Sequence, residues 1–327
     1  MTDPAPVARR TPWWKGRALR LTLTTFVVGA VAVLFAISLS RNWQDVREQD
    51  LTPSWWWAVA IALFAAAVPV TGLLWRSLLL RLQPDAVVTR TEAVSVQSAS
   101  WLLKYIPGQV GSTLNKVLWA GRKSISRGAV LISVVYENVF LQVCSLAPGA
   151  AIVVAALGPQ VLGDEPYVLA LPLLALLPMA LVLWRPAFHR AVDVAARRAL
   201  KREVPRSFFL STRATLVLLV GFTVPRLLNA AGFVVLATAV TDVPPDEWAV
   251  FGAAYVLAGA IGILAVLVPS GLGVREAVIV AVLAPFVGIA AAIVVSVLAR
   301  LCSTVGDALV ALVYVLTRRT IPKEIRP

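Results

Sequence analysis

The sequence predicts an all-α polytopic membrane protein with about six to eight transmembrane helices. Hydrophobic residues make up 59% of its 327 residues, and only 14% are charged. The mean hydropathy is +0.82, and apolar runs of about 20 residues, long enough to cross a bilayer, recur along the chain. In a typical soluble domain about a quarter of the residues are charged, and disordered chains are more polar still. The composition therefore excludes both classes.

The formal net charge of +13 does not indicate a nucleic-acid partner. The basic residues lie between apolar runs, where they set orientation and contact anionic lipid headgroups. The single histidine, His189, and the two cysteines, Cys144 and Cys302, are too few for a structural zinc site or a disulfide framework. We therefore expect no metal, no cofactor and, because His189 has no partner motif for a nucleophile, no enzymatic activity.

The predicted transmembrane domain covers residues 21–317, between a basic N-terminus (1–20) and a basic tail (318–327). The positive-inside rule places both termini on the cytoplasmic side of the membrane. The first apolar run is too long for a cleaved signal peptide and is read as a signal anchor. Simple crossings are predicted at residues 21–40, 54–75, 128–157, 167–184, 214–240 and 288–317.

The segment 185–213 carries eight Lys or Arg residues and is predicted to be cytoplasmic. Its alternation of apolar and basic residues fits either a helix on the anionic inner leaflet or a solvated loop. Ten of the eleven tryptophans lie near the ends of apolar runs, as an interfacial belt requires, and Trp101 is the exception.

Two segments do not read as simple crossings. Residues 93–120 are interrupted by Pro107, Gly108 and Gly111 and have basic residues on both flanks, which favours a re-entrant helical hairpin entered from the cytoplasm. Residues 248–285 are interrupted at 269–273 and fit either a second re-entrant hairpin or full crossings. The fold predicted here therefore contains two broken-helix hairpins.

The two interruptions also indicate an inverted repeat. Pro107 and Pro269 lie about 162 residues apart. That offset aligns a first repeat (about 54–157) with a second (about 214–317), and the flanking charges give matched spans opposite directions. Broken segments in such repeats form binding sites near the bilayer midplane, although two Pro-Gly turns can also align by chance.

The interruptions and the intramembrane charges supply the candidate binding residues. A glycine-rich break exposes helix N–H groups that favour an anion, and Arg275 would sit in the first turn after its break. The alternative is an Arg275–Glu276 pair extending to an interface. Buried charges are mostly paired and functional, although Glu137 with Arg226, or Arg300 with Asp307, would also fit purely structural pairs.

Cations outnumber carboxylates among these residues, which favours an anionic ligand. The candidate substrate-binding residues are Lys104, Pro107, Gly108, Gly111, Lys116, Glu137, Arg226, Pro269, Gly271, Gly273, Arg275, Glu276 and Arg300.

Two motifs resemble a known family. The segment 268–276 (VPSGLGVRE) resembles the P-x-G-x-G-x-R-E motif of the transmembrane region of lysylphosphatidylglycerol synthases and its stand-alone relatives. The segment 105–111 (YIPGQVG), with Glu137 further on, is similar to the first-half motif of that family. Family members often carry Arg where this chain has Asn115 or Lys116, and where it has Asn138.

The resemblance implies a flippase-like transporter that moves a phospholipid or polyprenyl-linked saccharide with an anionic headgroup between leaflets. It also implies a separate synthase or glycosyltransferase as partner, because this sequence has no soluble synthase domain. A polyprenyl-phosphate-dependent glycosyltransferase stays open, with Asp45, Glu48 and Asp50, or Asp242 and Asp246, as base candidates. So does a non-transporting scaffold. The sequence does not specify the oligomeric state.

Overall fold

The computed structural model describes residues 54–103, 110–158, 180, 184–200, 205–264 and 273–322, and every structural statement below concerns these ranges. They form helices and contain no β-strand, which confirms the all-α class. Five helices are long and apolar enough to cross a membrane, as a polytopic membrane protein requires. The predicted span at 21–40, and nearly all of that at 167–184, lie outside the described residues.

The first half of the described chain contains four helices. They are α3 (Trp55–Leu82), α4 (Arg90–Leu102), α5 (Val110–Arg122) and α6 (Arg127–Leu157). Three of these helices, α3, α4 and α6, begin after a Ser or Thr whose side chain caps the first turn; at the start of α6 the Ser126 hydroxyl accepts from the Ala129 N–H. Thr89 and Glu92 form a reciprocal capping box at the start of α4.

The second half repeats this order of helices. It contains α9 (Thr212–Thr238), the short η5 (Pro245–Glu247), α10 (Trp248–Leu264) and α11 (Val274–Arg319). The last of these is broken at Gly288, whose φ of 78° and ψ of 160° are not helical, so it consists of two helices, 274–287 and 289–319. Glycine tolerates this conformation because it has no side chain. The predicted last helix, 288–317, thus begins one residue later than expected.

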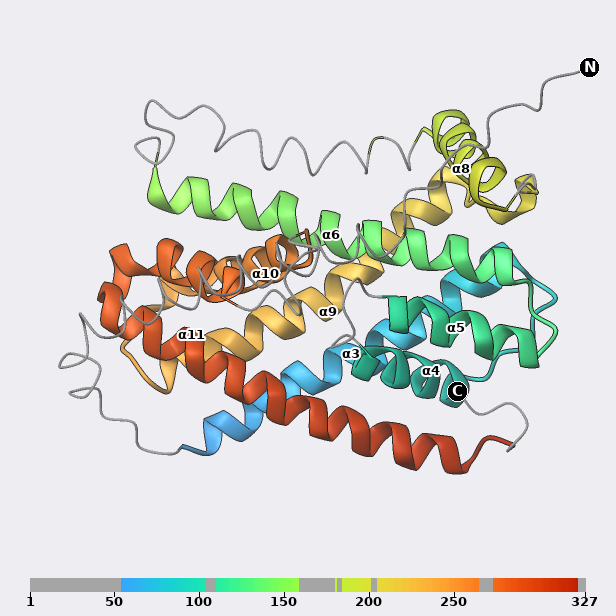
Figure 1. Ribbon diagram of the computed structural model, residues 1–327. Helices are drawn as coiled ribbons and strands as arrows, with labels where there is room; N and C mark the ends of the chain where they lie inside the picture. Colours follow the sequence, from blue (N-terminus) through green and yellow to red (C-terminus); the bar gives the residue numbers. More distant parts are fainter. Residues whose placement is uncertain are drawn as a thin grey trace, which may run out of the picture.

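Matched helices run in opposite directions in the two halves (Figure 1). There α3 and α9 pack side by side and run in opposite directions. The second part of α11 also runs opposite to α6, although these two helices lie on opposite sides of the bundle. The remaining helices of the two halves form two hairpins at opposite ends of the molecule: α4 with α5, and α10 with the first part of α11. This is the arrangement that the predicted inverted repeat requires.

The helices of the first hairpin are too short to span a bilayer. Both α4 and α5 contain 13 residues, which corresponds to about 20 Å at 1.5 Å per residue, whereas the hydrocarbon core is about 30 Å thick. The residues that join them, 104–109, lie outside the described ranges, as do the joining residues 265–272 of the second hairpin. Re-entry of either hairpin into the membrane stays a prediction.

The basic segment after the predicted fourth crossing contains a helix, α8 (Arg185–Leu200), followed by η4 (Arg206–Phe208). Its apolar side is fixed to the bundle by Phe188, which is buried and contacts the rings of Tyr136 and Phe209 with centroid distances of 5.0 and 5.6 Å. The helical interpretation of this segment therefore agrees with the structure.

Trp101, the tryptophan that does not fit an interfacial belt, joins the two halves. It lies at the end of α4, and its Nε1–H donates to Asp307 Oδ1 on α11 at 2.7 Å. A hydrogen bond from a neutral donor to a carboxylate is stronger than one between neutral groups. Trp101 thus ties the first hairpin to the last helix of the second half.

We expect the Trp101–Asp307 contact to have a measurable coupling energy. In a double-mutant cycle of Trp101→Phe and Asp307→Ala, the two substitutions should be non-additive by about 1 kcal/mol or more in the free energy of unfolding. The measurement is unfolding by an anionic detergent in mixed micelles, followed by far-UV circular dichroism. Strict additivity of the two single changes would contradict the role given to this bond.

Candidate functional site

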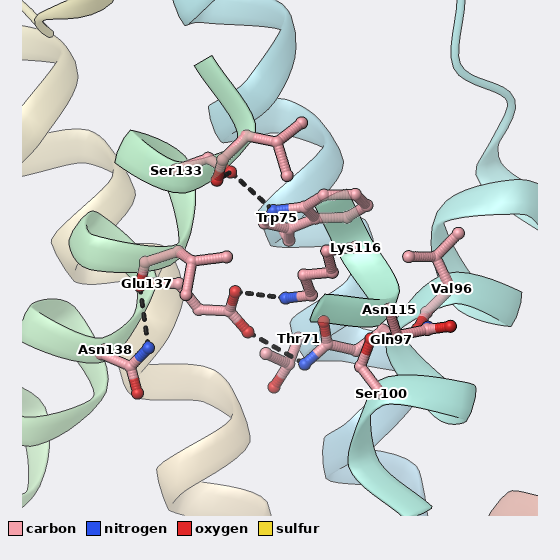
Figure 2. A network of polar contacts seen from close by, with 12 residues as sticks. Thr71, Trp75, Val96, Gln97, Ser100, Asn115, Lys116, Ser133, Glu137 and Asn138 are labelled. Atoms are coloured by element: carbon pink, nitrogen blue, oxygen red, sulfur yellow. Dashed lines mark hydrogen bonds and ion pairs between the residues drawn. The ribbon is translucent and has the colours of Figure 1, made fainter. Parts of the chain in front are cut away.

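A buried ion pair lies where the first hairpin meets α6. Lys116 of α5 and Glu137 of α6 form this pair, with side-chain exposures of 2% and 6%. The second carboxylate oxygen of Glu137 accepts from the Gln97 side-chain amide of α4 at 2.9 Å. Figure 2 shows the three side chains converging from three helices. Because both charges are removed from water, each depends on the other for its stability.

Aromatic rings enclose this pair on the α3 side. The Lys116 ammonium lies over the Trp75 ring, 4.6 Å from its centroid. The Trp75 indole N–H donates to the Ser133 hydroxyl of α6 at 2.9 Å, and its ring makes an edge contact with Trp119 of α5. Both tryptophans are fully buried. A cation over a ring face is stabilised further when it is desolvated, so Trp75 holds the ammonium in place.

The first hairpin has its own polar link. The Asn115 side-chain amide on α5 donates to the Ser100 hydroxyl of α4 at 3.0 Å (Figure 2). Asn138, next to Glu137, instead donates to the Val134 carbonyl of its own helix at 2.8 Å. Asn115 therefore joins the two hairpin helices, whereas the Asn138 amide bonds within α6.

A second ion pair occupies the related place in the second half. Arg300, in the long part of α11, contacts Glu276 at 3.1 Å between Nη1 and Oε1. The other oxygen of Glu276 accepts from the Gly273 backbone N–H at 2.6 Å, which caps the helix that follows the second interruption. Gly273 has a φ of 81°, a conformation that favours glycine.

The two ion pairs are related by an exchange of sign. In the first half the cation, Lys116, lies on the returning hairpin helix and the carboxylate, Glu137, on the long helix. In the second half the carboxylate, Glu276, lies on the returning helix and the cation, Arg300, on the long helix. In each half, one buried or half-buried salt bridge thus links the second helix of the hairpin to the long helix that follows it: α5 to α6, and the first part of α11 to its second part.

Two arginines between these pairs have no carboxylate partner in the described part of the chain. Arg226, midway along α9, has a buried Nε with no hydrogen-bond partner. Its charge interacts with those of Arg275 and Glu137, one from each half. The Arg275 guanidinium lies over the Tyr255 ring at 5.2 Å, and that ring stacks on Phe233. Arg226 and Arg275 therefore form an arginine centre: their charges interact, and neither makes a salt bridge with a carboxylate of the described residues.

The comparison with known families agrees with this architecture. The family model described as the lysylphosphatidylglycerol synthase TM region matches residues 20–311. The chain belongs to this family. No curated protein matches it. The match covers both halves, both hairpins and both ion pairs.

Within this member of the lysylphosphatidylglycerol synthase TM-region family, the sequence-predicted residues fall into three groups. Lys116, Glu137, Arg226, Gly273, Arg275, Glu276 and Arg300 lie in or beside the two ion pairs and the arginine centre. Gly111 lies buried in the first turn of α5. The others lie outside the described residues: Lys104, Pro107, Gly108, Pro269 and Gly271.

The pairing of charges differs from the structural pairs considered in the sequence. Glu137 pairs with Lys116 instead of Arg226, and Arg300 pairs with Glu276 instead of Asp307. Hydropathy fixes how deep a residue lies in the membrane, but the partner depends on which helix lies opposite. Two of the five predicted cations, Lys116 and Arg300, are therefore neutralised by carboxylates.

Three side chains of the site were not predicted. Gln97 and Trp75 complete the first ion pair, and Tyr255 lies beneath Arg275. Gln97 lies in a predicted broken segment, and a buried amide there is a signal for a polar network. Neither Trp75 nor Tyr255 can be told from an ordinary apolar side chain by pattern alone. Within the described residues no three metal-ligand side chains gather.

Proposed function

We propose that this protein is a flippase-like transporter that moves a lipid with an anionic headgroup between the leaflets of a bacterial cell membrane, with its termini in the cytoplasm. The observation that carries the proposal is the pair of uncompensated arginines, Arg226 and Arg275, between the two halves. Membership of a family named after a lipid synthase supports a lipid as the ligand. The proposed activity is the movement of a lipid between leaflets, without a chemical reaction.

The hairpins support transport for a reason of backbone chemistry. A helix that breaks within the membrane leaves N–H and C=O groups without partners, and each costs several kcal/mol in hydrocarbon. Such breaks persist only inside protein or beside water. Two hairpins at opposite ends, the first built from helices too short to span a bilayer, therefore favour a hydrated space near the midplane, where a headgroup could pass while its tails stay in lipid.

The charge environment supports an anionic headgroup. A charge near the membrane centre costs about 2.5–3.5 kcal/mol by insertion scales. Lys116 and Arg300 offset this cost by pairing with carboxylates, whereas Arg226 and Arg275 do not. A bound phosphate would accept charge-assisted hydrogen bonds from both guanidinium groups. The sequence contains no P-loop, so we propose that the movement is energy-independent or coupled to a gradient.

Lipid exchange in reconstituted vesicles tests this proposal. With an acyl-labelled anionic phospholipid, chemical quenching of the outer leaflet should show exchange well above that of protein-free vesicles. Arg275→Gln should lower the exchange rate at least about tenfold, because one headgroup contact is lost. The matched control is Arg319→Gln at the exposed end of α11, which removes the same charge and should leave the rate unchanged.

Two results would contradict the proposal. One is exchange at the protein-free rate for the natural sequence in correctly folded, monodisperse preparations. The other is an Arg275→Gln protein that exchanges lipid as fast as the natural one. Loss of a defined envelope glycan together with normal lipid distribution would instead favour the glycosyltransferase.

A further inference from the structure

The charges at the centre of the molecule do not cancel. Four of the six charged side chains there form two salt bridges, Lys116 with Glu137 and Glu276 with Arg300, and each bridge is neutral. Arg226 and Arg275 remain, and their positive charges repel one another. Each bridge carboxylate also accepts from a further donor, the Gln97 amide or the Gly273 N–H, and neither forms a salt bridge with Arg226 or Arg275. The described centre therefore carries two unbalanced positive charges.

The joining segments of the hairpins cannot remove this excess. Residues 104–109 and 265–272 contain no Asp or Glu, and the first of them adds Lys104. The segments that join the hairpin helices therefore contribute no carboxylate that could pair with either arginine.

We infer that the ligand of this site is a lipid with a dianionic phosphate, that is, a terminal phosphomonoester or a diphosphate. This inference rests on the proposed function and specifies its substrate class. A phosphodiester such as that of phosphatidylglycerol carries one negative charge and would leave one arginine unbalanced. A dianionic phosphate balances both, and its oxygens can accept from the two guanidinium groups at once.

Both arginines are only partly exposed, which makes the second charge of the ligand matter. Two unit charges 4 Å apart interact with about 1 kcal/mol in water, but with about 4 kcal/mol at an effective dielectric constant near 20. Arg226 Nε is shielded from solvent, and Arg275 lies over the face of Tyr255. Selection between one and two negative charges is therefore stronger here than at an exposed basic patch, where salt screens the difference.

The sharpest test compares two lipids that differ by one methyl group and one charge. Phosphatidic acid is a phosphomonoester, whose second pKa is about 6, and phosphatidylmethanol is its monoanionic methyl ester. At pH 8, native mass spectrometry of the detergent-solubilised protein with equimolar amounts of both should show phosphatidic acid bound at least about tenfold more tightly. Polyprenyl phosphate and its methyl ester, compared in the same way, show which lipid tail the site accepts.

Substitution of each arginine tests whether the two guanidinium groups cause this preference. Arg226→Gln and Arg275→Gln should each reduce the preference for the phosphomonoester several-fold, whereas Arg319→Gln should leave it unchanged. A phosphomonoester preference with either pair of tails supports the inference. Two results would overturn the inference. One is equal binding of the phosphomonoester and its methyl ester with both kinds of lipid tail. The other is a phosphomonoester preference that persists in both the Arg226→Gln and the Arg275→Gln protein when these are folded.

Failure of this inference is distinguishable from failure of the proposed function. Equal exchange of phosphatidic acid and phosphatidylmethanol between leaflets would overturn the charge selection and leave the flippase activity in place. Selective binding of phosphatidic acid without exchange of any lipid would overturn transport and leave the dianionic site.

Discussion

Glu137→Leu is expected to destabilise the protein by about 3–5 kcal/mol, because it leaves the Lys116 ammonium buried without its carboxylate. Lys116 is 2% exposed and the Trp75 ring covers it, so water cannot replace the lost partner. The Gln97 amide loses its acceptor in the same change. The free energy of unfolding, measured by anionic-detergent titration in mixed micelles, should show this loss.

Removing both charges should restore most of that stability. In the double variant Lys116→Met/Glu137→Leu, apolar side chains of similar volume replace a salt bridge whose desolvation is costly. The control is Asn138→Ala, beside Glu137 and exposed, which should change the free energy of unfolding by no more than about 0.5 kcal/mol. A double variant as unstable as Glu137→Leu would contradict the pairing of Lys116 with Glu137.

Gly72→Ala is expected to destabilise the protein by about 1–3 kcal/mol through overpacking where α3 meets α4. A Cβ at this position would lie 2.9 Å from Gln97 Cβ and 3.0 Å from the Ala93 carbonyl oxygen. Backbone cannot give way as a flexible side chain can, so α4 must shift. Because Gln97 holds Glu137, the shift should also lower the lipid-exchange rate.

Gly259→Ala is the matched control for this prediction. Nothing lies within 4 Å of a Cβ built at Gly259 in α10. Alanine has a higher helix propensity than glycine by about 1 kcal/mol, so this variant should be neutral or more stable. Opposite signs in the two variants, read from the same detergent titration, are the expected result. Equal effects at the two positions would show that close packing at Gly72 does not decide the outcome.

The helices were predictable because the pattern of hydropathy and breaks is strong. The expected span 128–157 matches α6 (Arg127–Leu157) within one residue, since Ser126 caps it and Gly158 ends it. The expected span 54–75 was too short: α3 continues to Leu82. Arg76 and Arg81 were read as a cytoplasmic flank, but Leu78, Leu79 and Leu82 pack into the core on the other side of the helix.

The contacts within the site were less predictable for a geometric reason. The constant offset between the two interruptions was enough to align the two halves of the sequence. The position of Glu137 and Arg300 inside apolar spans was enough to predict that each needs a partner. Which side chain faces them depends on the rotation of each helix about its axis and on the approach of the hairpins. That information lies in contacts between helices distant in sequence, such as α4 with α11, and no local pattern encodes it.

Gly288 decides how far the last quarter of the chain reaches. Without a break, the 46 residues from Val274 to Arg319 would form a rod of about 70 Å, more than twice the thickness of the hydrocarbon core. The non-helical conformation of this single residue folds the rod back on itself without any connecting loop. A change in the angle between the two arms must therefore be absorbed by the φ and ψ angles of Gly288 and its neighbours, because no loop is present to take it up.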